Sequence, residues 1–279
     1  MPPVLLVIVG ICSVQFGAAL AKGLFDEVGV AGAVFLRVLF AAIALMLVFR
    51  PSLRMPSRRA LPLLVTFGIV LAAMNLSFYA SLERIPLGVA VTLEFVGPLG
   101  VAVAGSRSAV DLVWVGLAAL GIVLLSDFGS GGLDLVGAGL ALMAGGFWAA
   151  YILLSARVGR VFQGGDGLAL AMVVGAVVLT PVGVARGGAE LAEPAVLAVA
   201  MGVALLSSAI PYGLEMEALR RMPTRVFGTL MSLEPAAGVL AGFVVLGEDL
   251  SAREIVAILL VAAASAGASR GASVAPRDA

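Results

Sequence analysis

Three ionisable residues lie inside long apolar stretches of this chain: Arg37, Glu94 and Glu234. A charged side chain inside a membrane costs about 2.5–3.5 kcal/mol on insertion scales unless it is paired or hydrated. Such residues therefore mark substrate or ion pathways, and a carboxyl group there is a candidate proton carrier. The depths of Arg37 and Glu94 along their stretches match well enough for an ion pair. The alternative interpretation is that such a pair only locks two helices together.

Prolines accompany both glutamates. Pro98 has no N–H, so the helical hydrogen bond to the carbonyl of Glu94 cannot form, and Pro235 directly follows Glu234. Irregular backbone at membrane depth persists only where it is buried in protein or lines a wet cavity. We therefore expect helix breaks at Pro98 and Pro235, beside a central site, and a further break at Pro211. The alternative is that these prolines only shape the packing of helices.

Other polar and aromatic side chains inside the apolar stretches are candidates for the same cavity. They are Gln15, Asn75, Tyr79, Trp148, Tyr151, Tyr212 and Glu215. Trp and Tyr near the ends of membrane spans are often interfacial anchors, so packing or anchoring is the alternative role for each aromatic residue.

The composition requires a membrane protein. The 279 residues are 62% hydrophobic and 12% charged, whereas a soluble domain is nearer half apolar and a quarter charged. There is no His and one Cys, Cys12, which argues against a disulfide framework and against a His- or Cys-based metal site. The net charge of zero gives no reason to expect a nucleic-acid partner. Common catalytic and nucleotide-binding motifs are missing, so we expect no enzyme activity, no cofactor and no metal.

The elements that must position the candidate residues are membrane-spanning helices of about 20 apolar residues. Charges and Gly or Pro breaks delimit ten such stretches, which predicts an all-α integral membrane protein with ten transmembrane helices. The expected spans are 3–21, 31–49, 61–82, 87–105, 110–126, 135–154, 167–184, 195–216, 225–246 and 254–268. The connections are short, and no soluble domain fits between the spans.

The charges of the loops predict the orientation. Lys and Arg in short loops are retained on the cytoplasmic side. If the N-terminus is inside, twelve Lys and Arg residues fall on the inner side and four on the outer side. The four outer residues are Lys22, Arg84, Arg186 and Arg253. We therefore expect both termini in the cytoplasm and a multi-pass protein of a bacterial inner membrane; an Arg-, Ala- and Gly-rich chain is typical of a GC-rich bacterial genome.

The two halves of the chain resemble each other. Residues 82–86 (LERIP) match residues 219–223 (LRRMP) at an offset of 137, and the same offset pairs Pro98 with Pro235. Because each repeat holds five spans, an odd number, the copies must lie in the membrane with opposite topology. Inverted repeats are typical of transporters whose central site opens alternately to either side. The expected units are a first repeat at 1–126, a second repeat at 135–268 and a cytoplasmic tail at 269–279.

Three stretches go beyond generic membrane patterns. They are 85–98 (IPLGVAVTLEFVGP), 210–225 (IPYGLEMEALRRMPTR), and 227–235 (FGTLMSLEP) with the LGE that follows at 246–248. These stretches resemble the threonine/homoserine exporter branch of the EamA-type drug/metabolite transporter superfamily, and the similarity extends over essentially the whole chain.

The resemblance implies a ten-helix inverted-repeat fold in the inner membrane that exports amino acids or similar metabolites, in exchange for protons. In such folds spans one to four and six to nine surround the cavity, and spans five and ten lie outside it. The resemblance thereby implies that ten residues face or border the cavity: Gln15, Arg37, Asn75, Tyr79, Glu94, Trp148, Tyr151, Tyr212, Glu215 and Glu234.

Together these observations favour a secondary transporter that exports small neutral amino acids by alternating access. Glu94 or Glu234 would face the ammonium group of the zwitterion and Arg37 its carboxylate. The expected partners are an amino acid, protons and the lipid bilayer, and the chain is expected to be a monomer or a homodimer. The alternative within the superfamily is export of another metabolite or a drug. Outside it, the alternatives are a membrane enzyme, which would need a polar cluster at the end of a span, or a passive pore.

Overall fold

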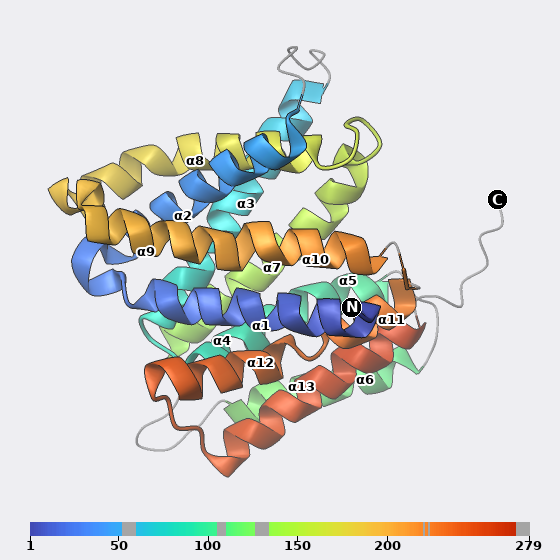
Figure 1. The fold of residues 1–279 in the computed structure, drawn as a ribbon. Coiled ribbons are helices and arrows are strands. Elements are labelled where there is room, and N and C mark those ends of the chain that lie inside the picture. Colours follow the sequence, from blue (N-terminus) through green and yellow to red (C-terminus); the bar gives the residue numbers. More distant parts are fainter. Residues whose placement is uncertain (52–59, 105–109, 126–133, 220, 223, 272–279) are drawn as a thin grey trace.

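The computed structural model describes residues 1–51, 60–104, 110–125, 134–219, 221, 222 and 224–271. Within these residues the chain is helical, without a strand (Figure 1). Seven helical segments are long and apolar enough to cross a membrane: Pro3–Lys22, Phe25–Phe49, Ala60–Leu82, Leu135–Val158, Asp166–Gly187, Pro194–Glu215 and Val226–Leu246. Two shorter apolar segments are Leu87–Val101 and Leu112–Leu124. The expectation of an all-helical chain with many apolar spans is confirmed; the number ten and the inverted arrangement stay predictions.

The helices follow one another with short connections. The first half contains α1 (Pro3–Lys22), α2 (Phe25–Phe49), α3 (Ala60–Leu82), α4 (Leu87–Glu94), α5 (Val96–Ala104) and α6 (Asp111–Leu125). The second half contains α7 (Leu135–Val158), α8 (Asp166–Gly187), α9 (Pro194–Ala204), α10 (Ile210–Leu219), α11 (Thr224–Met231), α12 (Glu234–Ala241) and α13 (Ala252–Gly271). A 3₁₀ turn η1 (Ala189–Ala192) and two π-helical turns, η2 (Leu205–Ala209) and η3 (Gly242–Leu246), complete the order.

Local signals explain several helix ends. The Asp134 carboxylate accepts a hydrogen bond from the Gly137 N–H at 2.8 Å and thereby caps the start of α7. This hydrogen bond holds the pKa of Asp134 below its usual range, with a smaller contribution from Arg84. Ser251 and Glu254 bond reciprocally at the start of α13, as in a capping box.

The start of α2 differs from the prediction. The helix begins at Phe25, six residues before the expected span, and contains a kink at Gly29, whose φ of 65° is readily adopted only by glycine. Asp26 and Glu27 lie in the first turn, where negative side chains stabilise a helix N-terminus. The two acids limit the apolar stretch in the sequence, but both belong to the helix. Of the expected tail, residues 272–279 lie outside the described residues.

Three of the predicted spans are interrupted, and a proline follows each interruption. The helix breaks at Phe95 between α4 and α5, and at Ser232–Leu233 between α11 and α12. Between α9 and α10 the chain instead widens into the π-helical turn η2. Pro98 and Pro235 lie in the first turn of the segment that follows, where a proline is tolerated because its N–H would be unpaired anyway. Pro211 follows η2 inside a helical segment that continues from Pro194 to Glu215, so the break expected there is a π-helical turn and the chain stays helical.

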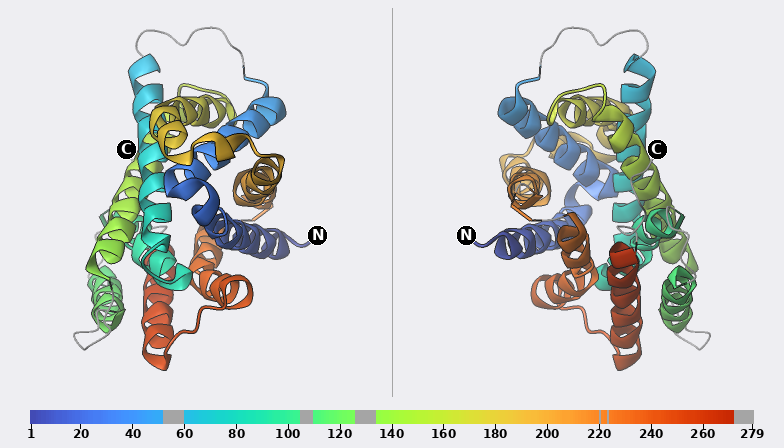
Figure 2. Two further views of the ribbon diagram at one scale, coloured as in Figure 1. Left: turned by 90° about the vertical axis from the view of Figure 1, so that its left-hand side faces the viewer. Right: turned by 90° about the vertical axis from the view of Figure 1, so that its right-hand side faces the viewer.

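Helices from the two halves of the chain pack on one another. α2 packs along α8, α4 against α12, and α6 along α13; α3 packs along α7 and α1 against α10. The α6–α13 pair forms the lower edge of the molecule in Figure 1, far from α8 at the upper edge. Figure 2 shows α1 and α9 nearly end-on toward one side of the molecule, with α3 and α7 on the opposite side.

Candidate functional site

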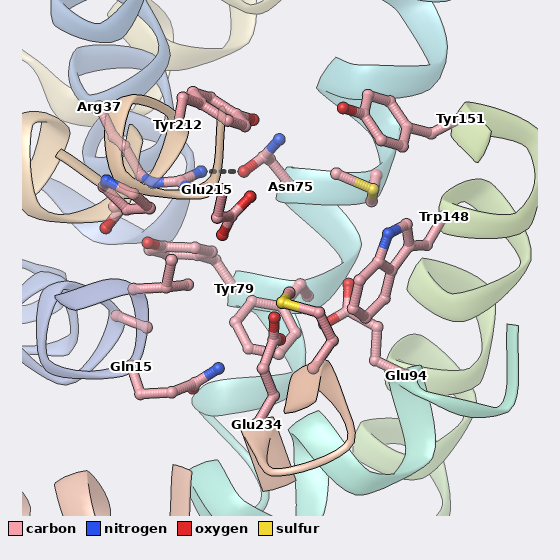
Figure 3. Close-up of a pocket in the computed structure, with 17 residues that line it drawn as sticks. Gln15, Arg37, Asn75, Tyr79, Glu94, Trp148, Tyr151, Tyr212, Glu215 and Glu234 are labelled. Carbon is pink, nitrogen blue, oxygen red and sulfur yellow. Dashed lines mark hydrogen bonds between the residues drawn. The ribbon is translucent and has the colours of Figure 1, made fainter. Parts of the chain in front are cut away.

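A cavity of about 230 Å³ lies between the two halves of the chain (Figure 3). Its lining comes from α1, α2, α3, α4, α7, η2, α10, α11 and α12. All ten residues that were predicted to face or border a cavity line this one, as does Pro211. The structure therefore brings the candidates together, while their roles in binding or coupling stay predictions.

The set of lining helices departs from the expectation in one respect. None of the residues that line the cavity comes from α8, the seventh predicted span. α8 packs on α2 and α3 and lies behind them. It therefore supports the wall that carries Arg37 and Asn75 without contributing to its surface.

Two residues of α3 hold Arg37. The Arg37 guanidinium donates a hydrogen bond to the side-chain oxygen of Asn75, and the Asn75 amide nitrogen donates to the Leu71 carbonyl at 2.8 Å. The guanidinium carbon also lies 5.2 Å from the centroid of the Tyr79 ring, within the range of a cation–π contact. Asn75 and Tyr79 are four residues apart and thus share one face of α3. This arrangement fixes the direction of the guanidinium.

The expected ion pair between Arg37 and Glu94 does not form. Both side chains line the cavity, but among the described residues no carboxylate lies within 4.0 Å of the Arg37 guanidinium. Matching depth was the basis for that expectation, and depth alone does not determine which way a side chain points around its helix axis. Arg37 points to Asn75 instead.

Three carboxyl groups line the same cavity. Glu94 is the last residue of α4 and Glu234 the first of α12, so each lies at a helix break; Glu215 lies on α10. Glu234 is 7% exposed, whereas Glu94 and Glu215 are partly buried. None of the three takes part in a salt bridge among the described residues. The cavity thus combines a guanidinium and three carboxyl groups that have no charged partner in the part of the chain that the structure describes.

Aromatic contacts fix much of the remaining wall. The Trp148 ring meets Phe95 edge to face, with centroids 4.9 Å apart, and Tyr151 stacks on Phe67 at 5.3 Å. Tyr79 meets Phe78 edge to face at 5.7 Å. Such pairs contribute about 0.5–1.5 kcal/mol beyond their buried area, so they hold the rings in place.

The break after Glu94 lies directly on α7. A methyl group added at Gly97 would lie 1.9 Å from the carbonyl oxygen of Gly145, and one added at Gly145 would lie 2.5 Å from the carbonyl oxygen of Glu94. Only glycine permits two backbones to approach so closely. Trp148 follows Gly145 by one helical turn, so this contact positions Glu94 and Trp148 together.

Four buried polar atoms of the cavity have no hydrogen-bond partner among the described residues: Gln15 Oε1, Arg37 Nε, Tyr79 OH and Ser207 Oγ. The Tyr79 and Ser207 hydroxyl groups lie near each other, but not in hydrogen-bonding geometry. Leaving a buried donor or acceptor unpaired costs about 1–3 kcal/mol. A cavity with several such atoms is suited to a ligand or water molecules that complete their hydrogen bonds.

Six residues that were not predicted also line the cavity: Val14, Ala18, Met74, Phe78, Ser207 and Met231. Two of them follow from helical spacing, because Ala18 and Phe78 each lie three residues after a predicted site residue, Gln15 and Asn75 respectively, and so share its helix face. Ser207 precedes Pro211 by four residues, so Pro211 leaves its carbonyl without the usual helical donor. That spacing was a usable signal for Ser207.

Similar proteins are found at the level of the family, of individual relatives and of the fold. Residues 135–270 match the EamA-like transporter family. The threonine/homoserine exporter RhtA of Salmonella typhimurium (strain LT2) is 44% identical over 268 residues, which cover 95% of this chain and 90% of the relative. The protein of the same name from Escherichia coli (strain K12) is 43% identical with the same coverage. A protein of known crystal structure superimposes with a TM-score of 0.61 over 94% of this chain and 96% of its own; at 19% identity this likeness concerns the fold alone.

Proposed function

Because this chain belongs to the EamA-like transporter family and to its threonine/homoserine exporter branch, we propose that it exports small neutral amino acids such as threonine and homoserine. The observation that carries the proposal is the cavity itself, which is lined by a guanidinium and by carboxyl groups that have no charged partner among the described residues. An amino-acid zwitterion needs one group of each sign. Its carboxylate binds Arg37, and its ammonium group binds Glu94 or Glu234.

The geometry of the cavity supports this ligand class. Figure 3 shows Arg37 and Glu94 on opposite sides of the cavity, with Glu234 below. Asn75 and Tyr79 hold the guanidinium, and its Nε–H has no partner among the described residues, so it can donate a hydrogen bond to a carboxylate. A volume of about 230 Å³ is below the range of about 300–1,000 Å³ typical of sites for drug-sized ligands. A small metabolite suits the cavity better than a large drug.

We further propose that protons drive the export. The sequence has no nucleotide-binding motif, so uphill transport has to use an ion or substrate gradient. A carboxyl group at the cavity can carry a proton or bind the ammonium group of the substrate, and it cannot serve both at once. This competition at Glu94 and Glu234 couples a proton entering to an amino acid leaving.

The proposed mechanism is alternating access between two inverted five-helix repeats. Two observations support it. Three helix contacts, α2–α8, α4–α12 and α6–α13, join predicted spans that the repeat makes equivalent: the second and seventh, the fourth and ninth, and the fifth and tenth. The offset of 137 also relates Met74 to Pro211, Asn75 to Tyr212, Phe78 to Glu215 and Glu94 to Met231, and every one of these residues lines the cavity. The proposed location is a bacterial inner membrane, with both termini in the cytoplasm.

Efflux measurements test the proposal. Bacteria that express the chain should resist inhibitory concentrations of threonine or homoserine, and should release these amino acids faster than cells with an empty vector. Purified protein in liposomes should export threonine in a way that depends on the pH gradient, and Glu94→Gln and Glu234→Gln should weaken that dependence. Unchanged resistance and unchanged efflux would refute amino-acid export. Wild-type proton dependence in both Gln variants would refute the proposed coupling groups.

The same liposomes separate the rival functions. A panel of metabolites and drugs identifies another substrate if amino acids are not exported. Conduction without any dependence on a gradient would indicate a passive pore.

A further inference from the structure

One side of the cavity carries three neutral polar groups that the binding of a zwitterion does not use. They are Gln15 on α1, Tyr79 on α3 and Ser207 on η2, with exposed fractions of 3%, 2% and 6%. All three line the cavity, and each has a buried oxygen atom without a hydrogen-bond partner among the described residues. Figure 3 shows Tyr79 between Arg37 and Gln15, on the side opposite Trp148.

The chain holds Ser207 firmly at this place. The Ser13 hydroxyl of α1 donates a hydrogen bond to the carbonyl of Leu206 at 2.7 Å. Gly17, one turn further along α1, lies so close that a methyl group there would be 2.4 Å from the Ser207 oxygen. The π-helical turn η2 changes the direction of the side chains within it, and such turns occur often at functional sites. The hydrogen bond at the neighbouring Leu206 and the close approach of Gly17 therefore position Ser207, whose hydroxyl has no hydrogen-bond partner among the described residues.

The unpaired atoms match an alcohol. Serine and tyrosine hydroxyl groups both donate and accept hydrogen bonds, while the Gln15 amide oxygen only accepts. An alcohol on the ligand can give its proton to one oxygen and accept a proton from another. A methyl group in the same position would leave these buried atoms unpaired. Sites built to hydrogen-bond a substrate hydroxyl reject the analogue without it far more strongly than apolar pockets reject a similar change.

We propose that Tyr79, Ser207 and Gln15 form a subsite that binds the side-chain hydroxyl of the substrate and makes the cavity select hydroxylated amino acids over apolar amino acids of the same shape. The proposal rests on amino-acid export through this cavity and adds the groups that determine its specificity. Arg37 and the carboxyl groups bind the carboxylate and ammonium groups that all amino acids share, and the subsite binds the side-chain hydroxyl that distinguishes threonine and homoserine from apolar amino acids.

The test uses pairs of ligands that differ by one hydroxyl group. Threonine is compared with valine, and homoserine with 2-aminopentanoate, in liposomes that contain the full chain. The wild type should favour the hydroxylated member of each pair. Ser207→Ala and Tyr79→Phe each remove one oxygen atom and should each lower the preference for threonine over valine by about tenfold, because the hydroxyl loses one partner.

Ser77→Ala is the matched control. Ser77 lies on α3, is 5% exposed, donates to the Ala73 carbonyl at 2.7 Å and does not line the cavity. This variant also removes one buried hydroxyl group, but its ratio of threonine to valine transport should equal that of the wild type. Because the ratio is measured within one preparation, it does not depend on how much of a variant folds.

The outcomes separate the two proposals. A wild type that transports neither threonine nor valine would refute amino-acid export itself. A wild type that transports both equally well, or Ser207→Ala and Tyr79→Phe variants that retain the wild-type ratio, would refute the subsite and leave export intact. Threonine-dependent thermal stabilisation of the purified variants gives a second readout, which should fall for the two subsite variants and persist for Ser77→Ala.

Discussion

The contact between the α4–α5 break and α7 can be tested by adding a single methyl group at Gly97 or at Gly145. The new carbon would lie 1.9 Å from the Gly145 carbonyl oxygen in the first variant and 2.5 Å from the Glu94 carbonyl oxygen in the second. Both neighbours are backbone atoms, which cannot rotate aside. To restore an ordinary contact of 3.4 Å, the segments have to separate by about 1.5 Å for Gly97→Ala and by about 1 Å for Gly145→Ala.

The separation sets the expected magnitude. Overpacking of this kind typically costs about 1–3 kcal/mol. For a protein of this size each kcal/mol lowers the unfolding temperature by about 2–4 °C, so a drop of about 2–12 °C is expected. Transport should fall further than stability does, because the same displacement moves Glu94 away from Trp148, and a shift of about 1 Å at a site can reduce activity by up to about 100-fold.

The assay compares each variant with a neighbouring glycine. Thermal unfolding of the purified protein gives the stability, and threonine efflux from liposomes gives the activity. Gly100→Ala and Gly146→Ala are the controls, since an added methyl group meets nothing within 4 Å at either position. Both controls should match or slightly exceed the wild-type stability, because alanine favours a helix over glycine. If Gly97→Ala and Gly145→Ala behave as these controls do, the two backbones do not touch and the reasoning is wrong.

Three further predictions concern charged groups. Glu248→Ala should lower the unfolding temperature more than Lys22→Met does. The Glu248 carboxylate forms a salt bridge with Lys22 at 2.7 Å and also accepts a hydrogen bond from the first N–H of α4 at 2.8 Å. Equal shifts would show that the bond to α4 contributes nothing. Because the pKa of Asp134 is lowered, its capping bond stabilises the fold above about pH 4, and this stabilisation is lost as the pH falls through the lowered pKa. The unfolding free energy of Asp134→Ala should therefore lack this loss of stability in acid. Arg37→Lys keeps the charge but removes the planar guanidinium that bonds Asn75 and lies over the Tyr79 ring. The KM for threonine should therefore rise about tenfold. An unchanged KM would exclude Arg37 as the group that binds the substrate carboxylate.

Much of the candidate site could be predicted because its residues are costly in a membrane. Glu94 and Glu234 stand out in apolar stretches, and the prolines beside them leave backbone carbonyls without a helical donor. Each feature needs a polar space nearby, so their positions in the sequence already indicate a cavity. The structure brings both glutamates to one cavity, at the ends of α4 and α12.

The spacing to Pro211 points to the backbone carbonyl of Ser207, but it could not show that the Ser207 hydroxyl faces the cavity. A serine inside a helix usually bonds a carbonyl of its own helix and then costs little, as Ser77 does with Ala73. Whether the hydroxyl is free depends on the local backbone, here a π-helical turn, and on the neighbouring helix. The partner of Arg37 was missed for a similar reason, since the choice between Glu94 and Asn75 depends on directions around the helix axes.

Under the proposed inverted repeat, the related pairs explain how a near-symmetric scaffold can bind an asymmetric ligand. Glu94 corresponds to Met231 and Phe78 to Glu215, so in each pair one half contributes a carboxyl group and the other an apolar side chain to the same cavity. Two carboxyl groups at symmetric positions would offer a zwitterion two equal orientations and would repel each other when both are charged. With one carboxyl group in each pair, the proposed roles of Arg37 and of the subsite at Tyr79 predict a single orientation of the substrate. We therefore expect Met231→Glu to fail as a rescue of Glu94→Gln in threonine efflux, because the new carboxyl group lies at the end of α11 and not at the end of α4, where Glu94 lines the cavity. Recovery of efflux would show that position does not matter and that only the number of charges does.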